Sequence, residues 1–167
     1  MRPIDPKDID RNVFSAIGAD WMLVTAGDRN KANTMTASWG GLGVLWGKNV
    51  ATIYVRPQRY TYEFLERGDY FTLSFLPGEY REALSFCGSR SGREVDKIAH
   101  CGLTPAYGQG DAPYFAEAGL ALVCHKLYFA DIDPAHFLDG ELDGKNYPNK
   151  DYHRMYIGEI VEALQKG

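Results

Sequence analysis

The chain has 167 residues, of which 45% are hydrophobic and 24% are charged, which fits one globular domain over residues 1–167. Its net charge is −4, from 18 basic and 22 acidic residues, and this balance argues against nucleic acid as a partner because backbone binding needs a basic face. No apolar run approaches the roughly 20 residues that span a bilayer, and the first residues contain no signal peptide. We therefore expect a cytoplasmic protein with no membrane partner.

Residues 1–12 are polar and contain two prolines, which predicts an extended N-terminal arm. A short turn at 14–18 leads into a buried strand at 21–26, and residues 33–39 are expected to form its hairpin partner. Glycines at 40, 41, 43 and 47 break up the next stretch, which indicates a turn. Their spacing fits neither a dinucleotide-binding fingerprint nor a P-loop.

A strong strand is predicted at 50–55, and Pro57 ends it because proline cannot donate to a central ladder. Helices are expected at 60–67 and 79–86, a single helical turn at 96–100, and strands at 70–75, 120–132 and 155–161. Residues 139–151 are polar and predict a surface loop. About six mostly adjacent strands with two or three short helices indicate a mainly β (α+β) protein with an antiparallel barrel.

The first cluster of candidate site residues lies at 33–39. Thr36 and Ser38 share one face of a strand, while Met35, Ala37 and Trp39 take the other. A small residue such as Ala37 leaves room for a flat ring, and free backbone groups at a strand end can match the ring's donors and acceptors. An ordinary half-buried strand with its hydroxyls in water is the alternative interpretation.

The second cluster lies around Pro57. Arg56 and Arg59 flank it, and Thr61 lies at the start of a predicted helix, whose free N–H groups and partial positive charge suit a phosphate. A guanidinium would add charge-assisted hydrogen bonds. Two surface arginines on a turn are the alternative. The basic loop at 89–93 is likewise either a solvated loop or an anion site.

Metal and nucleophile chemistry find little support in the sequence. The four histidines show no metal-ligand spacing, and Cys87, Cys101 and Cys124 form no C-x-x-C pair. The cysteines therefore indicate neither a disulfide framework nor a zinc site, and we expect buried thiols. No acid–base pair or nucleophile pair stands out either, so we assign no catalytic residue and no metal ligand.

Five segments carry a resemblance to a known family. In chain order, residues 33–39, 56–61, 68–74, 91–98 and 102–105 resemble the flavin reductase-like family, in the branch that contains flavoredoxin. The resemblance spans about residues 15 to 165. It implies an FMN-binding split β-barrel, antiparallel with Greek-key connections, that forms a homodimer with the flavin near the subunit interface.

The resemblance also implies which residues bind FMN. Residues 35–39 would line the isoalloxazine and ribityl chain, residues 59–61 would hold the phosphate with support from Arg56, and the 89–92 loop and Lys97 would close over the cofactor. The full set is Asn33, Met35, Thr36, Ala37, Ser38, Trp39, Arg56, Arg59, Tyr60, Thr61, Ser89, Arg90, Ser91, Gly92 and Lys97.

The implied function is an oxidoreductase that passes hydride or electrons through N5 of FMN, from NADH, NADPH or a protein donor to an acceptor. The protein's part would be placement and electrostatics. Where typical flavin reductases carry Ser-Ser or Ser-Pro, this chain has Ser38-Trp39, and a bulky indole there would narrow nicotinamide access. Two alternatives follow: a non-catalytic FMN electron carrier, and a split barrel that binds another flat ligand such as haem or a deazaflavin.

Overall fold

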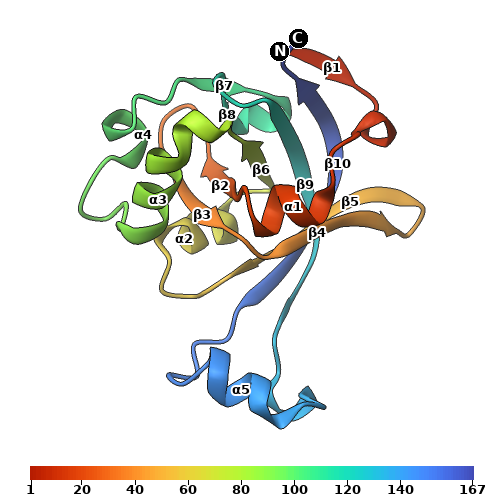
Figure 1. Ribbon diagram of the computed structural model, residues 1–167, viewed down its shortest axis with the longest axis vertical. Coiled ribbons are helices and arrows are strands. Elements are labelled where there is room, and N and C mark those ends of the chain that lie inside the picture. The colour runs from red at the N-terminus through yellow and green to blue at the C-terminus, as the bar shows by residue number, and fades with distance from the viewer.

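One antiparallel sheet forms the frame of the molecule in the computed structural model, which describes residues 1–167 (Figure 1). Its strands follow the order β3-β2-β6-β9-β10-β5-β4, and β1 pairs with β10. They are β1 (Arg2–Ile4), β2 (Met22–Gly27), β3 (Ala32–Ala37), β4 (Gly40–Leu45), β5 (Lys48–Val55), β6 (Tyr70–Phe75), β9 (Leu120–Asp131) and β10 (Arg154–Gln165). The two end strands, β3 and β4, do not pair with each other. The sheet is therefore an unclosed barrel, and the predicted mainly-β split barrel is confirmed.

Short helices and a small second sheet complete the fold. The α-helices are α1 (Val13–Gly18), α2 (Tyr60–Arg67), α3 (Arg81–Ser89), α4 (Lys97–His100) and α5 (Gly140–Asn146). The 3-10 turns are η1 (Pro6–Asp8), η2 (Gly78–Tyr80), η3 (Gln109–Asp111) and η4 (Pro134–His136), and the second sheet pairs β7 (Pro105–Tyr107) with β8 (Pro113–Phe115). None of the helices combines the length and apolar character that crossing a membrane requires.

The alternation of side chains along β2 separates two cores. Met22 and Val24 point into the main core of 21 buried residues, while Leu23 points to a second cluster of eight beneath α3. Helix α2 contributes Phe64 and Leu65 to the main core. Burying such side chains stabilises the fold by roughly 1.5–3 kcal/mol each, which fixes α2 against β2 and β3.

Strand β3 has one unpaired edge, which matters for the site. It pairs only with β2, in a hairpin whose turn is closed by Asp28, and this confirms the predicted hairpin. The strand ends at Ala37, so Ser38 and Trp39 lie just beyond it. Helix α3 packs against β3, and the last residues of the strand, 35–37, line a cavity.

The prediction of a glycine-broken turn at 40–47 was wrong. Residues 40–45 form β4, which pairs with β5 across a turn at Trp46 and Gly47. Pairing with the strong strand β5 outweighs the low strand preference of glycine. Gly40 is needed there because a Cβ would lie 2.7 Å from the carbonyl oxygen of Thr52.

Two segments that were expected to be irregular contain helices. Residues 14–18 belong to α1, whose N-cap Asn12 accepts a hydrogen bond from the N–H of Ser15. Residues 140–146 of the expected polar loop form α5, capped by Asp139. Both caps are the kind that asparagine and aspartate supply.

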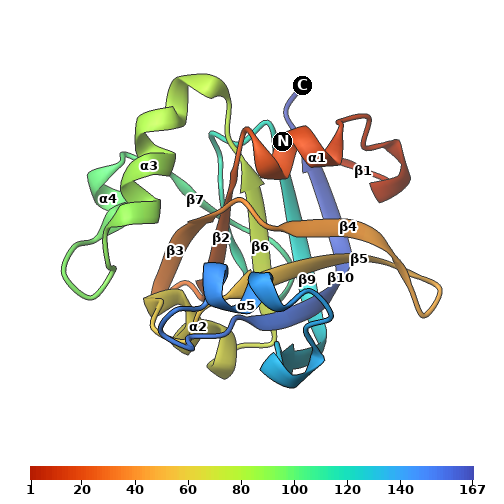
Figure 2. The ribbon, with the colours of Figure 1, turned by 60° about the horizontal axis from the view of Figure 1, so that its bottom comes forward.

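Figures 1 and 2 show α5 on an excursion between β9 and β10, below the barrel in Figure 1 and in front of it in Figure 2. The N-terminal arm is held by β1, which pairs with β10.

Candidate functional site

Two small cavities adjoin at Arg59. The first, here called the strand pocket, has a volume of about 190 Å³ and is lined by Met35, Thr36, Ala37, Ser38, Trp39, Tyr54, Arg56, Arg59 and His153. The second, here called the helix pocket, has about 170 Å³ and is lined by Gln58, Arg59, Tyr60, Gly88, Ser89, Arg90, Ser91, Gly92 and Lys97. Each is small for a ligand site, but together they reach the lower part of the usual range of about 300–1,000 Å³.

The helix pocket contains one buried cation, Lys97, and one half-buried cation, Arg59. Lys97 is only 3% exposed, and its ammonium donates to the carbonyl oxygens of Cys87 and Arg90 at 3.0 and 3.2 Å. Arg59, the N-cap residue of α2, donates to the carbonyl oxygens of Gly88 and Cys87 at 3.2 and 3.3 Å. Neither cation pairs with a carboxylate, so both meet only the last carbonyls of α3.

The electrostatics of the helix pocket favour an anion. Burial lowers the pKa of Lys97 to about 8, with the positive charge of Arg59 as the next cause, and burial also lowers the pKa of Arg59. The carbonyls at a helix C-terminus carry only about half an elementary charge, so they do not neutralise two cations. No side chain caps the N-terminus of α2 in the same place. A phosphate would meet two cations and free N–H groups there.

The loop over this pocket requires a glycine at position 92. A Cβ on Gly92 would lie 1.9 Å from Oδ1 of Asn33 and 2.9 Å from Cδ1 of Tyr60. Any side chain would therefore push the loop away from α2. Arg93 fixes the far side of the loop through Glu63 at 2.6 Å.

The strand pocket runs along the open end of β3. Met35 and Ala37 form part of the main core, whereas the Thr36 hydroxyl donates to the carbonyl oxygen of Leu84 at 2.5 Å and so ties β3 to α3. Trp39 is 47% exposed at the mouth. The pocket thus combines an unpaired strand edge with an aromatic rim, which suits a flat ligand.

Tyr54 and His153 also line the strand pocket, and sequence reasoning missed both. The imidazole Nδ1 of His153 lies 2.8 Å from the hydroxyl of Tyr147, and its ring centroid lies 5.2 Å from that of Trp39. Burial, and next the charge of Arg56, lower the pKa of His153 to about 4, so the ring is neutral at pH 7. No residue spacing in the sequence predicts that His153 lines this pocket, because His153 lies where the excursion between β9 and β10 returns to the barrel.

Three predicted site residues have partners inside the protein. Arg56 lines the strand pocket, but its guanidinium binds Oδ2 of Asp151 at 2.7 Å and the carbonyl oxygen of Asn146 at 2.9 Å. Thr61 is fully buried and its hydroxyl accepts a hydrogen bond from the amide of Asn33 at 2.8 Å. Asn33 and Thr61 line neither pocket, and the other predicted residues line one or both.

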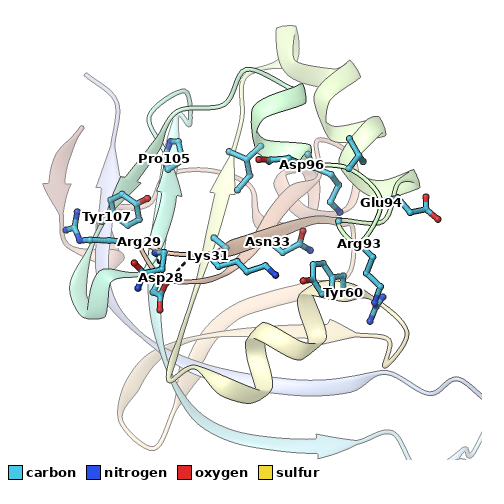
Figure 3. Close-up of a pocket in the computed structure, with 16 residues that line it drawn as sticks. Asp28, Arg29, Lys31, Asn33, Tyr60, Arg93, Glu94, Asp96, Pro105 and Tyr107 are labelled. Atoms are coloured by element: carbon cyan, nitrogen blue, oxygen red, sulfur yellow. Dashed lines mark hydrogen bonds between the residues drawn. The ribbon is translucent and has the colours of Figure 1, made fainter.

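A third cavity of about 440 Å³ lies beyond the helix pocket and shares Tyr60, Gly92 and Lys97 with it (Figure 3). Its lining includes Asn33. Its arginines already have carboxylate partners, since Arg29 pairs with Asp111 at 2.7 Å and Arg93 pairs with Glu63. Lys97 lines both cavities, but Arg59 and the uncapped start of α2 meet it only in the helix pocket, which is therefore the better phosphate site despite its smaller volume.

The fold is an open β-barrel, and the chemistry of its two adjoining pockets suits a flat ligand that carries an anionic group. No group of three or more His, Cys, Asp or Glu side chains is arranged to hold a metal ion. Residues 14–166 match the family described as flavin reductase like domain, and the chain belongs to this family. The resemblance seen in the sequence is thereby confirmed.

Solved structures of related proteins share the fold. The flavoredoxin of Desulfovibrio vulgaris (Miyazaki F) is similar with a TM-score of 0.69 at 25% identity, over 98% of this chain and 77% of that chain. An FMN-binding protein from Thermus thermophilus gives 0.69 at 20%, over 99% and 82%. The NADH:FAD oxidoreductase of Streptomyces globisporus C-1027, solved with NAD and FAD fragments, gives 0.67 at 21%, over 99% and 87%. No curated protein matches the chain significantly.

Proposed function

We propose that this protein is an FMN-binding oxidoreductase of its family. The observation that carries the proposal is the pair of cations, half-buried Arg59 and buried Lys97, which lack a carboxylate and line one pocket beside the uncapped start of α2. A phosphate group supplies the missing charge. The adjoining strand pocket then receives the rest of the ligand, with the unpaired edge of β3 beside it.

The residues have distinct roles in this arrangement. Arg59, Lys97 and the N–H groups at the start of α2 hold the phosphate, and Ser89 and Ser91 offer hydroxyls from the loop. The backbone of β3 meets the polar edge of the ring, while Trp39 lies at its open side. When bound, FMN supplies hydride and electron transfer at N5, between a reduced nicotinamide or a protein donor and an acceptor. The protein places the ring and limits access to it.

A non-catalytic electron carrier is the second candidate, and Trp39 is the observation that favours it. The indole stands at the mouth of the strand pocket and lies close to the neutral ring of His153. With the flavin in the strand pocket, these two side chains would narrow the access of a nicotinamide to the ring. Single electrons can reach a ring edge without such stacking, which suits a protein donor.

We further propose a homodimer in the cytoplasm. Large exposed apolar side chains occur on β4, on the outer part of β9 and on the excursion, namely Val44, Trp46, Tyr128, Phe129, Leu138 and Leu142. Trp39 is also exposed and lines the strand pocket, so a second copy that reached it would cover the ligand's open side. Exposed patches of this kind favour association. The three free thiols suit a reducing compartment.

The decisive experiment is the visible spectrum of the purified protein together with mass spectrometry of the small molecule released on denaturation. FMN and a flavin spectrum are expected. A Soret band or a deazaflavin mass would contradict the proposal. Steady-state oxidation of NADH and NADPH then separates the two candidates, because a carrier retains its FMN and shows no nicotinamide turnover.

Sedimentation of wild type and Trp46→Glu tests the dimer, which the added charge should weaken.

A further inference from the structure

Two of the three free cysteines meet under the helix pocket. The sulfur atoms of Cys87 and Cys101 lie 3.9 Å apart, although 14 positions separate them in the sequence. Cys87 lies near the end of α3 and is fully buried, whereas Cys101 follows α4 and is partly exposed. Cys124 is fully buried on β9, in the main core, while Cys87 belongs to the second cluster. The two partners therefore form an isolated pair.

The segment between these cysteines carries one wall of the helix pocket. It contains six of the pocket's nine residues, namely Gly88, Ser89, Arg90, Ser91, Gly92 and Lys97. The carbonyl oxygen of Cys87 itself accepts hydrogen bonds from both Arg59 and Lys97. A covalent link between the two sulfurs would thus close a ring around the phosphate-facing loop and fix it at its base.

We propose that Cys87 and Cys101 form a reversible disulfide that closes the loop over the helix pocket. The bond needs an S–S distance of about 2 Å, so the sulfurs must approach each other by about 2 Å. The short helix α4, with only four residues, precedes Cys101 and can shift more easily than the buried end of α3. This pairing does not depend on the proposed function.

The difference in solvent exposure between the two cysteines predicts which of them reacts first with an oxidant. A peroxide reaches the partly exposed Cys101, whose sulfur displaces water from it and becomes a sulfenic acid. Cys87 then attacks that sulfur, the S–S bond forms, and the displaced hydroxide leaves as water with the Cys87 proton. In sum, two thiols and one H₂O₂ give one disulfide and two waters. Burial raises the pKa of the Cys87 thiol to about 12, so Cys87 is not the thiol that reacts first with the peroxide.

The expected consequence is slower release of FMN, and this part rests on the proposed function. Cofactor exit from the helix pocket requires the 88–100 loop to move away from α2. A link at the base of the loop restricts that opening. We therefore expect the oxidised holoprotein to lose FMN several-fold more slowly than the reduced one.

Trypsin separates the partners, which makes the pairing directly observable. Cleavage yields one peptide of residues 82–90 with Cys87 and another of residues 98–126 with Cys101 and Cys124. The purified protein, with whatever cofactor it retains, is treated with H₂O₂, alkylated, and digested without reductant. In wild type and in Cys124→Ala, the two peptides should be joined, about 2 Da below their summed mass, and a thiol reductant should separate them. In Cys101→Ser, no joined peptide should form and Cys87 should remain alkylatable.

Three outcomes would overturn the pairing: Cys101 oxidised to sulfinic acid while Cys87 stays a thiol, a bond to Cys124, or a bond between two chains. FMN release is followed in parallel by the rise of free-flavin fluorescence after dilution. Equal rates for the oxidised and reduced protein would overturn the effect on the loop while leaving the disulfide intact. Failure to bind FMN would count against the proposed function alone, since the peptide result is obtained without it.

Discussion

Arg59 and Lys97 donate to the same carbonyl oxygen, that of Cys87, at 3.3 and 3.0 Å. One neutral acceptor thus holds two cations that repel each other. Burial and the nearby charge of Arg59 together lower the pKa of Lys97 to about 8. A bound dianion such as a phosphate group would reduce the repulsion between Arg59 and Lys97.

Removing the guanidinium should weaken FMN binding selectively. We expect Arg59→Ala to reduce affinity by about 1.5–3 kcal/mol, the usual worth of a hydrogen bond to a charged group. Riboflavin, which lacks the phosphate, should bind wild type and variant about equally in isothermal titration calorimetry. Arg67→Ala is the control, because Arg67 lies on the same helix but pairs with Glu63 at the surface. Equal losses for FMN and riboflavin would show that Arg59 does not contact the phosphate.

FMN affinity should depend on pH through Lys97. Below the pKa of about 8 the lysine is charged in the free protein, and affinity is at its full value. A bound phosphate raises this pKa, so binding takes up a proton above pH 8. Affinity then falls as pH rises, by at most about tenfold per pH unit. Calorimetry from pH 7 to pH 9.5 in buffers of different ionisation enthalpy measures the uptake, and Lys97→Met should abolish it.

The neutral state of His153 should make the fold sensitive to acid. Its pKa is about 4 in the folded protein and about 6.5 in the unfolded chain, so the unfolded chain binds more protons between these values. Stability therefore falls as pH drops from 6.5 to 4, by at most about 3 kcal/mol from this residue. Urea unfolding should show a smaller decrease for His153→Phe than for wild type. The exposed His136 provides a control, since His136→Gln should leave the wild-type decrease in place.

Trp39 should limit access to the strand pocket. If the indole excludes a nicotinamide, Trp39→Ala raises kcat/KM for NADH oxidation by about tenfold, equal to ~1.4 kcal/mol in the barrier. Phe14→Ala removes an exposed aromatic ring on α1 that lines neither pocket, and it should leave kcat/KM unchanged. A lower kcat/KM in Trp39→Ala would mean that the indole helps to bind the donor.

Local patterns in the sequence predicted much of the fold. The helix at 60–67 and the strand at 70–75 have the predicted bounds, because each has a clear periodicity and a glycine stop. Strand β4 was missed because its three glycines argue for a turn, and only pairing with β5 makes it a strand. Long-range pairing of this sort leaves no local trace.

The residues of the candidate site likewise divide into those that local sequence patterns predicted and those whose positions depend on long-range folding. Arg59 and the 89–92 loop could be named from charge and helix position, and the structure brings both to one pocket. His153 could not, because its place beside Trp39 depends on how the β9–β10 excursion folds back. The buried state of Thr61 was equally hidden, since the threonine binds Asn33 from 28 positions away.

The free edge of β3 has a consequence for how the site can evolve. An exposed strand presents the same amide and carbonyl groups whatever side chains it bears. Solved relatives keep this fold at only 14–25% identity. A ligand that is bound by backbone groups can still be bound after the side chains have changed. The residue types at 33–37 are therefore a poor guide to which distant relatives would bind the same ligand.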